Sequence, residues 1–147
     1  MDDGPILICY DGSKGADRAI EAAATLLAER RAIVLNVAPF VSPEESIGTA
    51  GGALPVDYPE LNMEAARERA NAGTAIARKA GFSAEPRAEL DTPTWEGVVK
   101  VADEIDAAAI VIASTGLSGL SELVKGKMPR AVAEHAGRPV LLVPPPH

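Results

Sequence analysis

Residues 110–127 read IVIASTGLSGLSELVKGK, a short apolar run followed by a segment of small residues and glycines. The apolar part is typical of a buried strand, and Ala113-Ser114-Thr115-Gly116 marks its end. Where such a strand stops, backbone N–H groups are left at one end of the sheet, and groups of this kind bind anions. The stretch therefore predicts a phosphate-binding site at the end of a buried strand.

The composition limits the classes to which the protein can belong. The chain has 147 residues, of which 47% are hydrophobic, enough for one domain with a substantial core. Its formal net charge of −7 argues against general binding to nucleic acid or to an anionic membrane. No apolar segment approaches the ~20 residues of a membrane span, and MDDGP does not begin a signal peptide. We expect a single-domain cytoplasmic protein, with Cys9 of the run ILICY as a buried, inert thiol.

Apolar runs alternate with helical periodicity along the chain. The runs predict strands at residues 6–10, 32–38, 82–90, 108–113 and 139–143. The third strand belongs at an edge, because charged residues alternate with its apolar ones and Pro86 cannot donate to a ladder. We therefore predict an α/β fold with a parallel sheet of order 3-2-1-4-5. The strand order then reverses between the first and fourth strands, so their ends at Tyr10-Asp11 and Ala113 to Gly116 lie where ligands bind.

Two helices are predicted before the third strand. Ser13 is the expected N-cap of the first, whose inner face would carry Ala16, Ala19, Ile20, Ala23 and Leu27. The second would begin at Asn62 and end before Gly81, the expected C′ residue. Its inner face is a stripe of mostly small residues, typical of close packing on a sheet: Met63, Ala66, Ala70, Gly73, Ala77 and Ala80.

Two further helices are predicted after the third strand. Thr92 is the expected N-cap of the first of them, with Pro93 at the first helical position. Its inner face would carry Trp95, Val98, Val99, Ala102 and Ile105. Pro129 suits the first turn of a shorter helix that runs to Glu134 or His135. Gly137 would close that helix, and His135 would interact with its dipole.

Residues 39–61 predict a long loop. Four prolines and the pair Gly51-Gly52 interrupt both helical and strand patterns there. Loops of this length are uncommon in compact domains and are usually functional or disordered. Both interpretations stay open, and the second is favoured for residues 46–53.

The last strand, at residues 139–143, would form the edge opposite the third strand. Its apolar residues carry no charge that would discourage pairing with another chain. A homodimer joined through this strand would cover the edge. The alternative is that the proline-rich tail, Pro144 to Pro146, caps the edge alone. We favour the homodimer, because prolines stop a strand without covering its side chains.

The chain offers binding groups more readily than catalytic ones. The segment Ser121 to Met128 fails as a Walker A loop at both ends, and no HExxH, GxSxG or paired-cysteine motif occurs. No nucleophile with a nearby base is apparent. We therefore expect a protein that is not an enzyme, with slow hydrolysis of ATP as the one activity left open.

Three parts of the sequence resemble the universal stress protein family: the first strand ending in Asp11-Gly12-Ser13, the segment VLNVA, and residues 113–143. The family's nucleotide-binding pattern is Gly-x2-Gly-x9-Gly-Ser/Thr. Its register falls here on Ala113, Gly116, Gly126 and Lys127. The resemblance implies a flavodoxin-like or Rossmann-like three-layer sandwich that is usually a homodimer, and it implies an ATP-binding regulatory module in the stress response.

The resemblance also implies roles for individual residues. The backbone of Val37 would contact the adenine, and Asp11 and Tyr10 would lie near the ribose and phosphates. The phosphate chain would lie over Ala113, Thr115 and Gly116, and the far side would be closed by Gly126, Lys127, Met128 and Pro129. The cofactor would be ATP or another adenine nucleotide together with Mg²⁺, which would offset the charge of Asp11.

Two residues depart from the family's pattern. Ala113 replaces the first glycine and disfavours a positive φ, and Lys127 replaces the hydroxyl residue that could cap a helix. Lys127 could hold the terminal phosphate, or it could fold into an empty pocket and pair with Asp11. The alternative function is therefore a nucleotide-free dimer that acts as an interaction scaffold.

Overall fold

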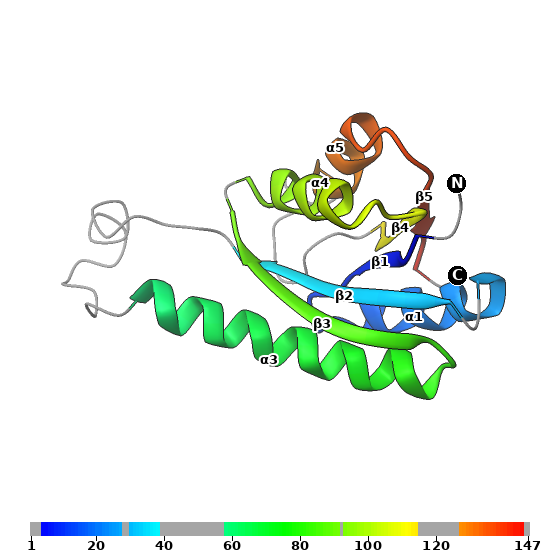
Figure 1. The fold of residues 1–147 in the computed structure, drawn as a ribbon, viewed down its shortest axis with the longest axis horizontal. Helices are drawn as coiled ribbons and strands as arrows, with labels where there is room; N and C mark the ends of the chain where they lie inside the picture. Colours follow the sequence, from blue (N-terminus) through cyan, green and yellow to red (C-terminus); the bar gives the residue numbers. More distant parts are fainter. Residues whose placement is uncertain (1–3, 28–29, 39–57, 92, 115–126, 146–147) are drawn as a thin grey trace.

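The computed structural model describes residues 4–27, 30–38, 58–91, 93–114 and 127–145 (Figure 1). The strands are β1 (Ile6–Cys9), β2 (Arg31–Ala38), β3 (Ser83–Leu90), β4 (Ala109–Ala113) and β5 (Val140–Val143). The helices are α1 (Lys14–Leu27), α3 (Tyr58–Lys79), α4 (Thr94–Ile105) and α5 (Lys127–His135). None of the helices described is long and apolar enough to cross a membrane.

The strands form one parallel sheet in the order β3-β2-β1-β4-β5, which confirms the predicted topology. Helices α1 and α3 cover one face and α4 and α5 cover the other, so the fold is a three-layer sandwich (Figure 1). Because neighbouring residues of a strand point to opposite faces, each strand supplies both cores. The larger core side chains on the α1/α3 face include Ile6, Ile8, Ile20 and Val34, and those on the α4/α5 face include Leu7, Leu35, Val98 and Ile110.

Helix α1 forms as predicted. The Ser13 hydroxyl accepts a hydrogen bond from the backbone N–H of Ala16 at 3.1 Å, the geometry of a helix N-cap. The side chains expected to face inward are buried at Ala16, Ala19, Ile20 and Ala23, and Leu27 is half-buried.

Helix α3 begins at Tyr58, earlier than the predicted start at Asn62, because Pro59 is compatible with a first helical turn. The predicted loop over residues 39–61 is therefore wrong at its last four positions, 58–61. The remaining positions, 39–57, lie outside the described residues. The stripe of small residues packs on the sheet as expected: a Cβ added at Gly73 would lie 2.6 Å from Cγ of Tyr10. Gly81 has a φ of +112°, as a C′ glycine requires.

Helix α4 differs from the prediction in its start and in its inner face. Pro93 is at the N-cap, with φ −70° and ψ 156°, and not at the first helical position, because the helix begins one residue later. Thr92 lies outside the described residues. The fully buried positions are Gly97, Val98, Val101 and Ala102, whereas Trp95, Val99 and Ile105 are only half-buried. The helix is thus rotated relative to the predicted face, because one flank of it packs against α5 and not against the sheet.

The contact between α4 and α5 includes an aromatic pair. The rings of Trp95 and His135 stack with centroids 4.5 Å apart and planes 18° apart. His135 lies in the last turn of α5, as predicted, and Gly137 follows with a φ of +65°. The stack joins the two helices that cover this face.

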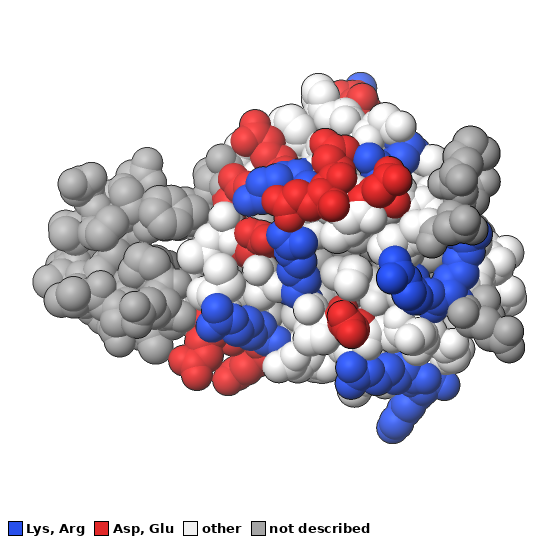
Figure 2. All heavy atoms as spheres, in the orientation of Figure 1, with Lys and Arg blue, Asp and Glu red and all other residues white. Residues whose placement is uncertain are grey.

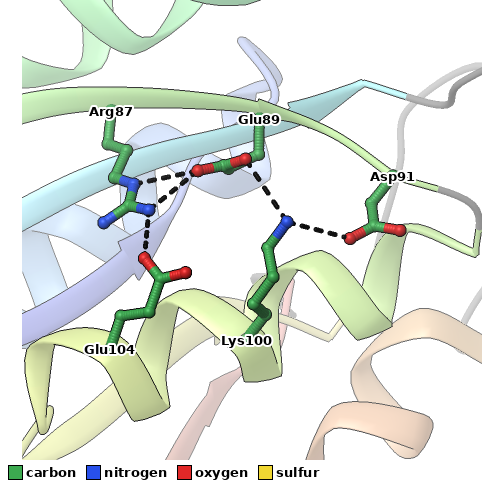
Figure 3. Close-up of polar contacts among 5 residues, drawn as sticks. All are labelled: Arg87, Glu89, Asp91, Lys100 and Glu104. Carbon is green, nitrogen blue, oxygen red and sulfur yellow. Dashed lines mark hydrogen bonds and ion pairs between the residues drawn. The ribbon is translucent and has the colours of Figure 1, made fainter.

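Strand β3 lies at the edge of the sheet, as predicted, with Pro86 exposed. Figure 2 shows acidic and basic side chains interleaved over β3 and α4, and Figure 3 shows the ion pairs among them. The Arg87 guanidinium contacts Glu89 at 2.8 Å and also pairs with Glu104. Lys100 contacts Asp91 at 3.3 Å and Glu89 at 3.5 Å. These five residues, which we call the β3–α4 ion network, link the edge strand to the helix beside it.

We expect Arg87→Met to lower the free energy of unfolding by about 1 kcal/mol, because it leaves two carboxylates of the network without their shared cation. Methionine keeps much of the apolar stem, so the loss reports charge more than packing. Urea unfolding followed by Trp95 fluorescence would measure it. Arg130→Met is the matched control, because the pair between Arg130 and Glu134 is 82% and 56% exposed and should contribute little. Equal effects of the two substitutions would contradict a stabilising network.

Candidate functional site

A crevice opens at the carboxyl ends of β1, β2 and β4, where the strand order reverses. It encloses about 380 Å³, counting the space at its open mouth. Its lining is mostly apolar: Cys9, Tyr10, Asp11, Ala16, Leu35, Asn36, Val37, Val98, Ile112, Ala113 and Met128. The crevice therefore lies where the strand order led us to expect a ligand.

Five of the ten residues expected to bind the nucleotide line this crevice together: Tyr10, Asp11, Val37, Ala113 and Met128. Pro129 is buried in the first turn of α5 and is not among the lining residues. Lys127 begins α5, but its side chain is not described. Thr115, Gly116 and Gly126 lie outside the described residues. The structure thus brings together the strand ends predicted to hold the base and sugar.

Asp11 sits at the rim, directly before the first turn of α1. Its Oδ1 accepts a hydrogen bond from the backbone N–H of Ser13 at 2.9 Å. Gly12 lies between them with a φ of +85°, a conformation that suits glycine. The turn made by these three residues directs the chain out of β1 and into α1.

Tyr10 offers the crevice its backbone, because its side chain lies on the other side of the sheet. The ring belongs to the core under α1 and α3, and its hydroxyl donates to Oδ1 of Asp17 at 2.6 Å. Burial, and then the hydrogen bond to Asp17, raise the pKa of Tyr10 above its usual range. The phenol is therefore held neutral and away from the crevice, and only the main chain of Tyr10 is available to a ligand.

Ala113 is the last residue of β4 and pairs with Val143. It does not adopt a positive φ, since Asp106 is the non-glycine residue with a positive φ in the described part of the chain. Alanine in place of glycine therefore causes no backbone strain here. The backbone strain expected from replacing the first glycine of the pattern is therefore absent. What distinguishes Ala113 from glycine for a bound ligand is its methyl group.

Val37 forms one wall of the crevice together with α4. It is 8% exposed and belongs to the core under α4 and α5. A Cβ added at Gly97 would lie 2.8 Å from Cγ1 of Val37 and 3.0 Å from Cβ of Asp91. Gly97 therefore lets α4 come close to the end of β2 and sets the position of this wall.

Asn36 is the polar lining residue that the sequence interpretation missed. It is 4% exposed, and its Nδ2 donates to the carbonyl oxygen of Tyr10 at 2.7 Å. Among the described residues, its Oδ1 has no hydrogen-bond partner. The signal was present in the sequence, because Asn36 interrupts an otherwise apolar run near the carboxyl end of a strand.

The crevice offers no evident nucleophile. Cys9 is 7% exposed, and burial, followed by the charge of Asp11, raises its pKa to about 12. The thiol therefore stays protonated at neutral pH, as expected for an inert cysteine. In the described part of the chain, no three His, Cys, Asp or Glu side chains are grouped as they would be in a metal site.

Comparison with known proteins identifies relatives of this fold. A sequence model described as the universal stress protein family matches residues 4–144. A universal stress protein family member from Burkholderia pseudomallei is 25% identical, with 97% of this chain and 96% of that chain covered and a TM-score of 0.70. A universal stress protein from Archaeoglobus fulgidus is 26% identical, with 95% and 93% covered and a TM-score of 0.66. The search of curated proteins found no match.

The A. fulgidus universal stress protein also matches as a complex with dAMP, at 24% identity and a TM-score of 0.65, with 97% of this chain and 99% of that chain covered. At this identity the match supports the fold alone. The similarity extends over almost the whole of both chains, so the fold described above is that of the complete relative.

The raised pKa of Tyr10 predicts a loss of stability at alkaline pH. Because its pKa in the folded protein lies above the ordinary value of 10.0, the contribution to stability is complete below pH 10 and falls as the pH rises above it. Tyr10→Phe should cost about 1 kcal/mol at pH 7 through the lost hydrogen bond. It should also make the decline of unfolding free energy above pH 10 shallower. Urea unfolding at pH 7, 9, 10 and 11 tests this, and parallel declines in both proteins would contradict it.

Proposed function

The chain belongs to the universal stress protein family, whose sequence model covers residues 4–144, and we propose that it is a cytoplasmic regulatory module that binds an adenine nucleotide in the stress response. The observation that carries the proposal is the crevice at the reversal of strand order. Solved structures of similar fold include complexes with cAMP, dAMP and AMP. An adenine nucleotide is therefore the ligand class that we assign to this crevice.

The residues of the crevice fit the base and sugar of such a ligand. Its walls at Leu35, Val37 and Val98 are apolar, as a flat purine requires, and the carboxylate of Asp11 at the rim can accept hydrogen bonds from ribose hydroxyls.

The phosphates are assigned to the residues that align with the family's nucleotide-binding pattern and to their neighbours. In this proposal Ala113, Thr115 and Gly116 lie under the phosphate chain, and Gly126, Lys127, Met128 and Pro129 close the far side. ATP with Mg²⁺ is the proposed form of the ligand, because a divalent cation reduces the repulsion between Asp11 and the phosphates.

A binding role is proposed in preference to a catalytic one. The thiol of Cys9 is protonated and the phenol of Tyr10 lies in the opposite core, so neither can attack a phosphate. Asp11 is the one carboxylate among the described lining residues, and its Oδ1 already accepts a hydrogen bond from the backbone N–H of Ser13. The alternative, a nucleotide-free scaffold, is the conclusion that a failure to bind nucleotide would support.

Nucleotide binding predicts thermal stabilisation by Mg-ATP. A ligand that binds only the folded protein at a hundred times its Kd adds about 2.7 kcal/mol of stability. We therefore expect the melting temperature to rise by several degrees with millimolar Mg-ATP, but not with Mg²⁺ alone. No shift with Mg-ATP, combined with no nucleotide retained after purification, would contradict the proposal.

Gly97→Ala tests the location of the site. The added methyl would displace the Val37 wall, so we expect affinity for Mg-ATP to fall by about tenfold. Gly81→Ala is the matched control: it places the same methyl at a φ of +112°, with nothing within 4 Å of it. It should lower stability and leave affinity unchanged. Isothermal titration calorimetry would measure the affinity of both variants for Mg-ATP. Equal affinities of Gly97→Ala and wild type would contradict a ligand in contact with the Val37 wall.

We also propose that two copies pair through β5. This strand is an edge of the sheet, and Leu142 on it is 42% exposed. The tail after it is tied to the same chain, because Arg18 donates to the carbonyl of Pro144 at 2.7 Å. Pro144 and Pro145 are themselves exposed. The tail therefore leaves the apolar side chain of Leu142 uncovered, and a second copy would cover it.

Leu142→Lys should convert the dimer to a monomer, because a buried lysine at the centre of an apolar interface is strongly unfavourable. Sedimentation equilibrium at micromolar concentrations would measure the change. Leu26→Lys is the control, because Leu26 is 66% exposed on α1 and is not part of β5. A monomeric wild type would contradict the proposal and favour the proline tail as the cap of this edge.

A further inference from the structure

A groove lies at the amino end of the sheet, beside the C-terminal end of α1, which is to the right in Figure 1. Ile6 and Ala109, the first residues of β1 and β4, are part of its lining, so it lies at the opposite end of the strands from the crevice. It holds about 880 Å³, counting the space at its open mouth. The described lining is apolar apart from one arginine: Ile6, Leu26, Leu27, Arg30, Ala108, Ala109 and Pro139.

The apolar part of this lining includes core residues and one exposed leucine. Ile6 is fully buried, and Leu27, Ala108 and Ala109 pack against the core under α1 and α3. Leu26 is 66% exposed, the highest value for a large hydrophobic side chain in the described part of the chain. A ligand with an apolar chain would remove this leucine from water, which is favourable.

Arg30 is the polar side chain of the lining, and it differs from the other arginines in a similar environment. The half-buried arginines of the described chain are Arg18, Arg30, Arg87 and Arg138. All of them except Arg30 donate to a backbone carbonyl or to a carboxylate. The guanidinium of Arg30 has no hydrogen bond or ion pair with a described residue, although groups withdrawn from water are normally paired.

The charges around the groove indicate that the partner of Arg30 comes from outside the chain. The protein has 21 acidic residues against 14 basic ones, and none of the described acidic residues lines the groove. The backbone of Arg30 is held in place, because its carbonyl accepts a hydrogen bond from the N–H of Ser83 at 3.1 Å. The dipole of α1 opposes an anion at this end of the helix, so the guanidinium itself has to hold the anion. A carboxylate suits this role, since its two oxygens match the paired N–H groups of a guanidinium.

We propose that this groove binds a small carboxylic acid with an apolar chain. The carboxylate pairs with Arg30, and the chain lies against Leu26, Leu27 and Pro139. None of the residues that line the groove also lines the crevice. The proposed site is therefore separate from the nucleotide site and does not depend on it.

The test uses hexanoate as the probe, with hexanamide and acetate for comparison. Hexanamide has the same shape without the charge, and acetate has the charge without the chain. Wild type should bind hexanoate with a Kd of about 1–10 mM, the order expected for a small ligand in an open groove. Hexanamide should bind about tenfold more weakly, and acetate should not bind detectably. Amide chemical shifts of the full chain, measured by NMR at pH 7, would give the affinities and should move at Leu26, Arg30 and Ala109.

Arg30→Met tests the ion pair. It should weaken hexanoate by about tenfold and bring its affinity to within about threefold of that of hexanamide, because the charge-assisted pair is lost. Arg31→Met is the matched control, because Arg31 is exposed and lines a separate hollow with Ser83 and Glu85. It should leave the affinity for hexanoate unchanged. Leu26→Ala should weaken both hexanoate and hexanamide, by about threefold each, through the lost apolar contact. If Arg30→Met does not fold, Arg30→Gln replaces it with the same expectation.

Three results would overturn the proposal. The first is no binding of hexanoate at tens of millimolar, and the second is equal affinity of wild type and Arg30→Met for hexanoate. The third is a set of shifts at Val37 and Ala113 with none at Leu26 and Arg30, because the acid would then occupy the crevice. The binding of Mg-ATP is measured separately, so these results leave the nucleotide proposal standing.

Discussion

The structure depends on the burial of β1 in the middle of the sheet. This strand has only four residues, Ile6–Cys9, and all four are buried. It is paired with β2 on one side and β4 on the other, and both faces are covered by helices. Such a strand has no freedom to shift its register, because a slip by one residue would exchange the side chains of the two cores. The turn that follows it is therefore held in one place.

The alternation of side chains along β1 decides what the crevice can do. Cys9 points toward the α4/α5 core and Tyr10 toward the α1/α3 core. The phenol is thereby removed from the crevice, and its carbonyl is left as the group that meets Asn36. Asp11 comes next, at the rim, where its carboxylate shapes the turn into α1. The last residue of β1 and the two residues after it thus supply an apolar wall, a buried carbonyl and a carboxylate.

Much of this arrangement follows from the sequence, and the failures have physical causes. The N-cap at Ser13 and the C′ glycine at Gly81 depend on local patterns, and both are confirmed. The strand order, also confirmed, follows from the edge character of the third strand and from the rules for parallel crossovers. The inner face of α4 was misjudged because α5 covers one flank of it, a tertiary contact that periodicity does not reveal. Asn36 was not predicted to line the crevice, because an apolar run was interpreted as a strand from its apolar residues and the one polar residue within it was given no role.

The binding of an anionic ligand by a chain with a net charge of −7 requires a local source of attraction. The cations of the β3–α4 ion network are occupied by carboxylates, and Arg138 pairs with Asp103 at 2.8 Å. None of these side chains lines the crevice. Affinity in our proposal therefore has to come from the apolar walls, from backbone N–H groups, from Lys127 and from the divalent cation that accompanies the phosphates.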